Sequence, residues 1–274
     1  MRFLVAALVG ACTTGGTSAA VATSRPSVGL SAAPGGPAVE LTIFAAASLA
    51  GVLVEVKGAY EAEHPGATLT ISSDSSAALE TQIEQGAPAD VFLSADTTNS
   101  MKLVEGGFSA GDAVVFAGNE LTIVVPSDNP AGVTSPADLA KPGLKIIAAG
   151  EEVPITGYAK QLVANLAKEA GFPTDFEARY DANVVSKEDN VKAVIAKIEI
   201  GEGDAAIVYV TDAKGSTGVK AIDVPEGANV FAKYAGVVVG ASANQEAART
   251  FLGWLASSDG QVILSSFGFL PPSP

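Results

Sequence analysis

The chain of 274 residues has one cysteine and one histidine. A disulfide needs two cysteines and a Cys/His zinc site needs several such ligands, so counting excludes both. Charged residues are also scarce, at 17% of the chain. Even so, no segment after the N-terminal one reaches the ~20 consecutive apolar residues that a membrane-spanning helix requires. We therefore expect no disulfide framework, no side-chain metal site and no membrane span in the body of the chain.

Basic residues are also few. Thirty acidic residues face 16 basic ones, for a formal net charge of −14. This balance argues against nucleic acid and against anionic lipid headgroups as partners. Hydrophobic residues make up 48% of the chain, which is typical of a globular protein and too apolar for disorder. The length allows one large domain or two modest ones.

The N-terminus has the pattern of a targeting segment. Arg2 precedes the apolar stretch Phe3–Val9, and small residues then lead to Cys12. A lone cysteine is often a buried core thiol, but its place directly after an apolar stretch favours lipoprotein processing. We predict a signal peptide over residues 1–12 that ends at a lipidated Cys12, and a flexible Gly/Ser/Thr/Ala/Pro-rich tether over 13–38. The folded part would then lie outside the cytoplasmic membrane, anchored to it.

From about residue 39, short β-type runs alternate with segments of helical periodicity. This alternation predicts βαβ units with parallel strands, and hence an α/β fold. The pattern occurs in both halves of the chain, which indicates two lobes: residues 39–121 plus 237–274, and residues 122–236. The expected strands are Leu41–Phe44, Thr68–Ile71, Val91–Leu93, Leu121–Val125, Leu144–Ala148, Ala205–Val210 and Ala235–Val239.

Several expected helices begin where a strand runs into small or polar residues. The first backbone N–H groups of a helix have no partner within it, and the helix dipole is positive there. Several such ends in one crevice would bind an anion without any cationic side chain. Serine and asparagine are also ordinary N-caps, and spacing alone does not separate the two roles. The helix starts are Ala45–Ser48, Asp74–Ala77, Val153–Gly157 and Asp189–Val191.

Longer stretches around these helix starts resemble one family, the periplasmic molybdate-binding proteins of ABC importers. The resemblance covers residues 40–274. It implies a two-lobed, type II-like periplasmic-binding-protein fold, with a mixed sheet flanked by helices in each lobe and the ligand in the cleft between them. The stretches that carry it are, in family order, Leu41–Leu49, Ser75–Ile83, Gly86–Asp96, Val153–Ala159, Asn190-Val191 and Gly203–Ala213.

The resemblance also implies which residues contact the ligand. Ser48 and Ser76 would each donate from the hydroxyl and the backbone N–H. Ile155 and Val191 would each donate from the backbone N–H alone. Tyr209 would donate from its phenolic O–H, although by pattern alone it is a β-strand aromatic of the core. The cargo implied is molybdate or tungstate, passed to a membrane permease with its ATPase. A monomer without a bound cofactor is expected.

The sequence departs from the family pattern at Ile155-Thr156, where a small residue and glycine are usual. Glu151 and Glu152 lie just upstream, and we expect both to point into solvent. A site built from donors alone selects a fully deprotonated anion, because a protonated one needs an acceptor for its proton. Another tetrahedral oxyanion, such as sulfate, is the alternative cargo.

Catalysis is the main competing class of function. Ser48 as a nucleophile would need a base, and the single histidine, His64, lies in a helix-breaking cluster at the far end of the helix that follows Ser48. No G-x-S-x-G elbow or phosphate-binding loop is present. The sequence therefore predicts a binding protein and not an enzyme.

Overall fold

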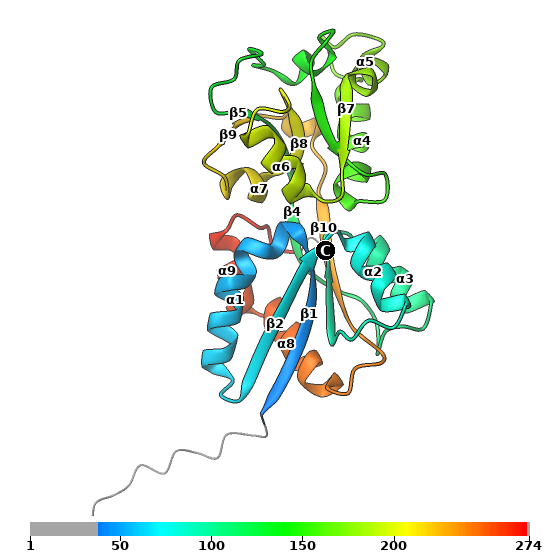
Figure 1. Ribbon diagram of the computed structural model, residues 1–274, viewed down its shortest axis with the longest axis vertical. Helices are drawn as coiled ribbons and strands as arrows, with labels where there is room; N and C mark the ends of the chain where they lie inside the picture. Colours follow the sequence, from blue (N-terminus) through cyan, green and yellow to red (C-terminus); the bar gives the residue numbers. More distant parts are fainter. Residues whose placement is uncertain (1–37, 273–274) are drawn as a thin grey trace, which may run out of the picture. The chain divides into compact units, whose positions relative to one another are not determined.

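A computed structural model describes residues 38–272 of the chain. The strands of these residues form separate β-sheets, and the helices pack around the sheets (Figure 1). The α/β class expected from the alternating pattern is confirmed. The predicted signal peptide over residues 1–12, the lipidated Cys12 and all but the last residue of the predicted tether lie outside the described residues.

The first sheet has five strands in the order β2-β1-β3-β10-β4. β1 is parallel to both β2 and β3, whereas β10 is antiparallel to β3 and β4. The sheet is therefore mixed, and its parallel strands point their carboxyl ends the same way. Its strands are β1 (Val39–Ala46), β2 (Ala67–Asp74), β3 (Val91–Ser94), β4 (Val114–Asn119) and β10 (Ala232–Val238).

Helices cover both faces of this sheet, and we call sheet and helices together the first lobe. One face carries α1, α8 and α9, and the other carries α2 and α3 (Figure 1). A short 3₁₀ turn, η1 (Ala47–Leu49), connects β1 to α1. The helices are α1 (Ala50–Glu63), α2 (Ser76–Glu84), α3 (Thr98–Glu105), α8 (Gln245–Ala256) and α9 (Ser258–Ser266).

The second lobe is built on a three-stranded antiparallel sheet, β8-β5-β9, and a parallel pair, β6-β7. A single bridge between Ile146 and Ala205 connects the two. Helices α4 and α5 pack on one side, and α6 and α7 on the other (Figure 1). The strands are β5 (Leu121–Pro126), β6 (Ile146–Ala149), β7 (Val184–Glu188), β8 (Ala206–Tyr209) and β9 (Val219–Ile222); the helices are α4 (Pro154–Leu166), α5 (Phe176–Asn183), α6 (Val191–Glu199) and α7 (Val210–Lys214), with the 3₁₀ turns η2 (Pro136–Ala140) and η3 (Glu226–Ala228).

Two neighbouring segments connect the lobes. β4 ends at Asn119 in the first sheet, and β5 begins at Leu121 in the second lobe, so a single residue, Glu120, separates them. The return segment enters β10, where Ala232 pairs with Asn119. The predicted lobe boundary at 236/237 falls inside β10, which pairs with first-lobe strands along its length.

One continuous hydrophobic core extends through both lobes. It includes Leu49 of the first lobe, Ile155 of the second, and Tyr209 and Tyr234 near the connecting segments. A smaller cluster around Phe92 fills the space between the first sheet and the helices α2 and α3. The residues that connect the lobes are therefore held in well-packed surroundings.

Several elements have weak or short sequence patterns and were not expected. β7 is half polar, with the sequence Val-Val-Ser-Lys-Glu, and β9 has only four residues. α4 begins at Pro154, within the expected helix start Val153–Gly157, because proline is favoured in the first turn of a helix, where its missing N–H costs nothing.

Candidate functional site

A small cavity lies at the carboxyl ends of strands from both lobes. β1, β2, β6, β7 and β8 each end beside it and lead into a helix. The cavity is small, with a void of about 10 Å³. No lysine or arginine is among its lining residues in the described part of the chain. These are Ala46, Ala47, Ser48, Ser75, Ser76, Ala95, Val153, Pro154, Ile155, Asn190, Val191 and Tyr209.

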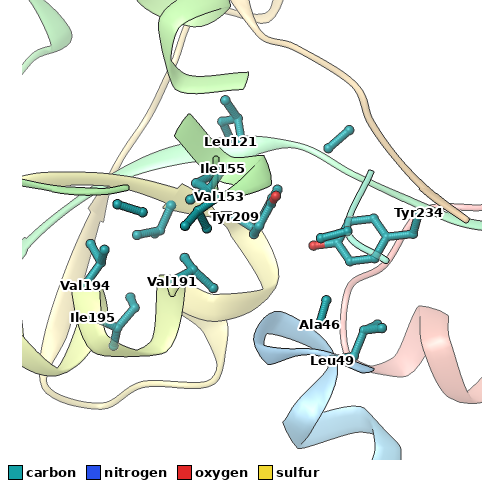
Figure 2. Close-up of a cluster of buried hydrophobic side chains, with 14 of the residues drawn as sticks. Ala46, Leu49, Leu121, Val153, Ile155, Val191, Val194, Ile195, Tyr209 and Tyr234 are labelled. Carbon is teal, nitrogen blue, oxygen red and sulfur yellow. The ribbon is translucent and has the colours of Figure 1, made fainter. Parts of the chain in front are cut away.

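The structure brings all five residues implied by the resemblance to this one cavity. Four of them lie in the first turn of a helix: Ser48 in η1, Ser76 in α2, Ile155 in α4 and Val191 in α6. The fifth, Tyr209, ends β8. Figure 2 shows Ile155, Val191 and Tyr209 among the buried side chains. The convergence that spacing could not establish is therefore present.

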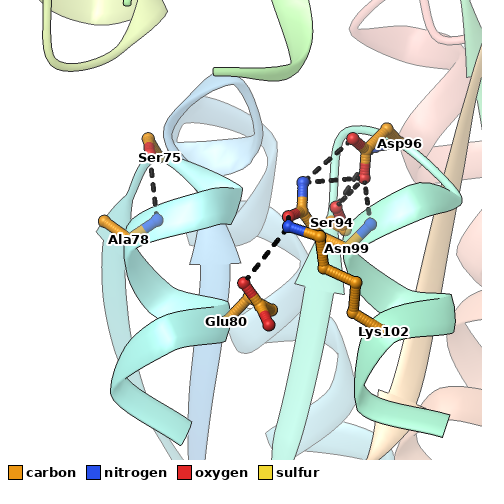
Figure 3. A network of polar contacts seen from close by, with 7 residues as sticks. All are labelled: Ser75, Ala78, Glu80, Ser94, Asp96, Asn99 and Lys102. Carbon is orange, nitrogen blue, oxygen red and sulfur yellow. Dashed lines mark hydrogen bonds and ion pairs between the residues drawn. The ribbon is translucent and has the colours of Figure 1, made fainter. Parts of the chain in front are cut away.

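The N-caps of two of these helices are neighbours of the expected ligand residues. Ser75 Oγ accepts a hydrogen bond from the Ala78 N–H at 3.2 Å and caps α2 (Figure 3). Asn190 Oδ1 accepts from the Ala193 N–H at 3.1 Å and caps α6. Capping thus occupies Ser75 and Asn190, and it leaves Ser76 without that role.

The Ser76 hydroxyl is oriented by a backbone donor. Ser76 is 1% exposed, and its Oγ accepts a hydrogen bond from the Ala95 N–H at 3.0 Å. A hydroxyl has one hydrogen to give, and here its oxygen already accepts from the protein. The O–H is therefore available to a ligand in the cavity.

Ser48 is 6% exposed, and its hydroxyl meets a second hydroxyl. Ser48 Oγ lies 2.9 Å from the hydroxyl oxygen of Tyr234, a fully buried residue of β10. Tyr234 was not singled out from the sequence. It precedes the expected strand Ala235–Val239, and only the fold places it beside Ser48.

The second lobe contributes backbone groups at Ile155 and Val191, which are 2% and 5% exposed. Pro154 is the first residue of α4 and has no N–H, so Ile155 provides the first donor of that helix. The Thr156 hydroxyl donates to the Ala149 carbonyl oxygen at 3.0 Å. The departure from the family pattern at Ile155-Thr156 is thus accommodated locally, because Thr156 turns its polar group away from the cavity.

The Tyr209 hydroxyl differs from the other polar groups of the site because it is buried and unpaired among the described residues. The residue is 1% exposed, and its hydroxyl has no hydrogen-bond partner within residues 38–272. Burial raises the pKa of Tyr209 well above its ordinary value, and the neighbouring Tyr234 adds to the effect. The phenol therefore stays protonated as a donor. An unpaired buried hydroxyl costs about 1–3 kcal/mol, which a ligand oxygen would recover.

Acidic groups lie near the cavity, and each has compensating contacts. Asp212, 1% exposed, forms an ion pair with Lys192 at 3.0 Å, although not in hydrogen-bonding geometry. Burial raises the pKa of Asp212. Asp96 accepts from the Ser94 hydroxyl at 2.8 Å and from the Asn99 N–H at 2.9 Å (Figure 3). These contacts reduce the repulsion that an anion would meet.

The two glutamates upstream of α4 behave as expected. Glu151 and Glu152 are both exposed. Hydrogen bonds from Lys160 and Lys187 lower the pKa of Glu151 to about 2, so this carboxylate is charged and neutralised on the surface. Neither glutamate lines the cavity.

The Gly86–Asp90 stretch, part of one of the segments that carry the family resemblance, has a structural role. Gly86 has a φ of +87°, which favours glycine at the end of α2. The Asp90 carboxylate accepts from the Thr42 N–H at 2.8 Å and from the Ser242 hydroxyl, so it fixes the start of β3 against β1 and the chain after β10. This motif supports the site from outside it.

Two lobes, two connecting segments and a small cavity lined by neutral donors define a periplasmic-type binding protein. The chain belongs to the family of bacterial extracellular solute-binding proteins, whose profile matches residues 41–270. It is 33% identical to the molybdate-binding protein ModA of Mycobacterium tuberculosis, over 87% of this chain and 88% of that one. It is 32% identical to YvgL of Bacillus subtilis, described as an ABC transporter substrate-binding lipoprotein, over 84% and 86%.

Solved structures show the same fold. The substrate-binding domain of a molybdenum ABC transporter from Clostridium difficile superposes with a TM-score of 0.64 at 29% identity, covering 85% of this chain and 99% of that one. The sulfate-binding protein SubI of Mycobacterium tuberculosis gives a TM-score of 0.77 at 22% identity, covering 86% and 88%. One more distant relative is an enzyme, the aconitate isomerase of a Pseudomonas species, at 26% identity over 86% and 89%.

Within residues 38–272, no helix combines the length and the apolar character needed to cross a bilayer. The same residues hold no group of three or more His, Cys, Asp or Glu side chains that could bind a metal ion directly.

Proposed function

We propose that this protein captures molybdate or tungstate outside the cytoplasmic membrane and delivers it to an ABC importer. The observation that carries the proposal is the buried Tyr209 hydroxyl without a partner among the described residues, at a cavity that Ser48 and Ser76 also line. Relatives named for molybdate, similar over most of both chains, support the choice of anion.

Neutral donors are sufficient for the binding energy. Each hydrogen bond to a charged oxygen contributes roughly 1.5–3 kcal/mol. Several such bonds, less the costs of desolvation and of ordering the lobes, leave about −8 to −12 kcal/mol, which corresponds to micromolar to nanomolar binding. The net charge of −14 acts mainly at longer range, and salt screens it within about 8–10 Å.

The site geometry favours binding over catalysis. His64 stacks on Tyr60 with ring centroids 4.0 Å apart, at the end of α1. At ~1.5 Å per residue, the helix places it more than roughly 20 Å from Ser48. We infer that the chain shares the fold of the isomerase relative without its chemistry.

We also propose that Cys12 carries the lipid anchor and that the protein acts as a monomer on its permease. The basis for the anchor is the Arg2–Cys12 sequence pattern and the similarity to a relative described as a lipoprotein. The monomer is what the family resemblance implies. A Cys12→Ala variant expressed in a bacterial host should move from the membrane fraction to the medium or periplasm. A variant that stays in the membrane fraction would contradict the anchor.

A thermal-shift panel of molybdate, tungstate, sulfate and phosphate tests the cargo. A ligand that binds only the folded state raises the melting temperature. Molybdate and tungstate should raise it at micromolar concentration, and sulfate and phosphate should not. A rise with sulfate alone would establish the alternative cargo. No rise with any of the four would contradict oxyanion binding.

A further inference from the structure

Tyr234 is the residue that contacts Ser48 from behind the cavity. It lies on β10, is fully buried, and packs edge-on against Tyr209, Phe116 and Phe269 with ring centroids 5.5–6.3 Å apart. Figure 2 shows its hydroxyl end on the side of Tyr209. Tyr234 itself does not line the cavity. Its hydroxyl is therefore fixed in place but out of reach of a ligand.

Asn119 approaches the same hydroxyl from the end of β4. Its Nδ2 lies 2.8 Å from Thr211 Oγ1 and 3.4 Å from the Tyr234 hydroxyl. Its Oδ1 accepts the Glu120 N–H at 3.0 Å. This last contact fixes the orientation of the amide, because a flipped amide would set its NH₂ group against the Glu120 N–H.

The amide orientation determines the direction of the hydrogen bonds that follow. Nδ2 can only donate, so the Tyr234 oxygen accepts from Asn119. The Tyr234 hydrogen then has one acceptor left among its described contacts, Ser48 Oγ. The opposite direction would leave the Tyr234 O–H buried without a partner, at a cost of about 1–3 kcal/mol. Asn119 therefore donates a hydrogen bond to Tyr234, and Tyr234 donates one to Ser48.

We propose that Asn119 and Tyr234 are positioning residues that make Ser48 an obligatory donor to the bound anion. With one lone pair of its oxygen engaged by Tyr234, Ser48 has its hydrogen left for the cavity, so a ligand at this position meets a donor. The proposal rests on the proposed function, whose site it deepens. It assigns to these two residues the selection of deprotonated oxyanions over protonated ones such as hydrogen phosphate.

The same arrangement exists at Ser76, which supports this interpretation. There the Ala95 N–H, which can only donate, occupies the serine oxygen. Ser48 and Ser76 therefore each have an oxygen that accepts from the protein and a hydrogen left for the cavity. At Ser76 the backbone sets the direction. At Ser48 two side chains set it, so it can be reversed by mutation.

An Asn119→Asp variant should reverse the direction of the hydrogen bond between Tyr234 and Ser48. The carboxylate accepts at both oxygens, so Tyr234 would donate to it and accept from Ser48, and the lone pairs of Ser48 would face the anion. We expect molybdate affinity, measured by calorimetry at pH 7, to fall roughly 10- to 150-fold, the equivalent of one lost charge-assisted hydrogen bond. Thr211→Val, which removes only the hydrogen bond from Asn119 Nδ2 to Thr211 Oγ1, is the matched control and should change affinity less than about threefold.

A double-mutant cycle separates this effect from simple charge repulsion. Tyr234→Phe alone should weaken molybdate binding about 3- to 10-fold and narrow the preference for molybdate over phosphate, because Ser48 is then free to accept. Adding Tyr234→Phe to Asn119→Asp should restore affinity to the level of Tyr234→Phe alone. Additive losses, or an unchanged preference over phosphate in Tyr234→Phe, would overturn the proposal. Melting temperatures of the ligand-free variants check that each is folded.

The wild-type titrations distinguish the two proposals. If the wild type binds sulfate and not molybdate or tungstate, the proposed cargo is wrong, and the same cycle tests the positioning role with sulfate. If the wild type binds the metal oxyanions and the cycle is additive, the positioning role is wrong and the cargo stands. If it binds none of the four anions, both are wrong.

Discussion

The two lobes contribute to the cavity in different ways. The first lobe offers serine hydroxyls, Ser48 and Ser76, each with its oxygen in contact with a polar group of the protein. The second lobe offers the backbone of Ile155 and Val191, whose side chains are apolar, together with the unpaired hydroxyl of Tyr209. Donors on side chains depend on residue identity, whereas backbone donors depend only on the helix start. Binding should therefore be sensitive to substitution at Ser48 and Ser76 in the first lobe and at Tyr209 in the second, and tolerant of side-chain changes at Ile155 and Val191.

The largest effect on ligand affinity is expected when the hydroxyls of Ser48 and Ser76 are both removed. Ser48→Ala combined with Ser76→Ala deletes two hydrogen bonds to a charged ligand, about 3–6 kcal/mol, and should weaken molybdate binding by roughly 10² to 10⁴ in calorimetry. Ser100→Ala is the control: Ser100 is a buried first-lobe serine that donates to the Ala235 carbonyl oxygen at 2.8 Å, away from the cavity. Equal losses in the control and the double variant would contradict the account.

Tyr209→Phe tests the one side-chain donor of the second lobe. The change removes a donor to the ligand, so affinity should fall roughly 10- to 100-fold. It also removes an unpaired buried hydroxyl, so the free energy of unfolding of the ligand-free chain should rise by about 1 kcal/mol. Calorimetry and chemical denaturation measure the two quantities. Tyr158→Phe is the control, because the ring centroids of Tyr158 and Tyr209 are 6.3 Å apart. It should change ligand affinity and the free energy of unfolding less than Tyr209→Phe does.

Val191→Pro tests a backbone donor by itself. Val191 is the first residue of α6, where proline is tolerated, and the preceding Asn190 has the extended backbone that proline requires. The variant should keep its melting temperature within a few degrees while losing about 10-fold in affinity. Val191→Ala, which keeps the N–H, should bind as the wild type does. Equal binding by the proline and alanine variants would show that this N–H is not a ligand.

The smallest effect concerns stability and pH. Burial raises the pKa of Asp212, so the folded state holds its proton more tightly than the unfolded state. Its contribution to the free energy of unfolding is then greatest below the unfolded pKa and declines as pH rises through the folded pKa. Asp212→Asn removes this decline, so its stability relative to the wild type should increase from pH 4 to pH 7. A constant difference across that range would contradict the assignment.

Much of the fold was predictable from local patterns. The alternation of β-type runs and helical periodicity predicted the α/β class, because each pattern reports which face of an element is buried. β7 and β9 were missed because they are short and partly polar, so their pairing depends on tertiary contacts that no local pattern records. The start of α4 at Pro154 is explained by proline's place in the first helical turn.

The site was predictable only in part. Ser48, Ser76, Ile155, Val191 and Tyr209 could be named through a family resemblance, and their meeting at one cavity required the fold. Spacing alone did not separate caps from ligand candidates, which the structure does by assigning capping to the neighbours of Ser76 and Val191.

Tyr234 and Asn119 lie more than a hundred and about seventy residues, respectively, from Ser48 in the chain. They share no motif with it. Their contacts arise because β4 and β10 run side by side where the lobes join. Hydrogen-bond direction between such distant residues is a property of the folded state, and no sequence pattern contains it.

A crystal structure of the chain with bound tungstate would show whether neutral donors from both lobes hold the anion. The account predicts one anion in the cavity, with the hydroxyl oxygens of Ser48, Ser76 and Tyr209 and the backbone nitrogens of Ile155 and Val191 all within about 2.7–3.2 Å of its oxygens. An anion held elsewhere, or one in this cavity with lysine or arginine side chains as its main contacts, would contradict it.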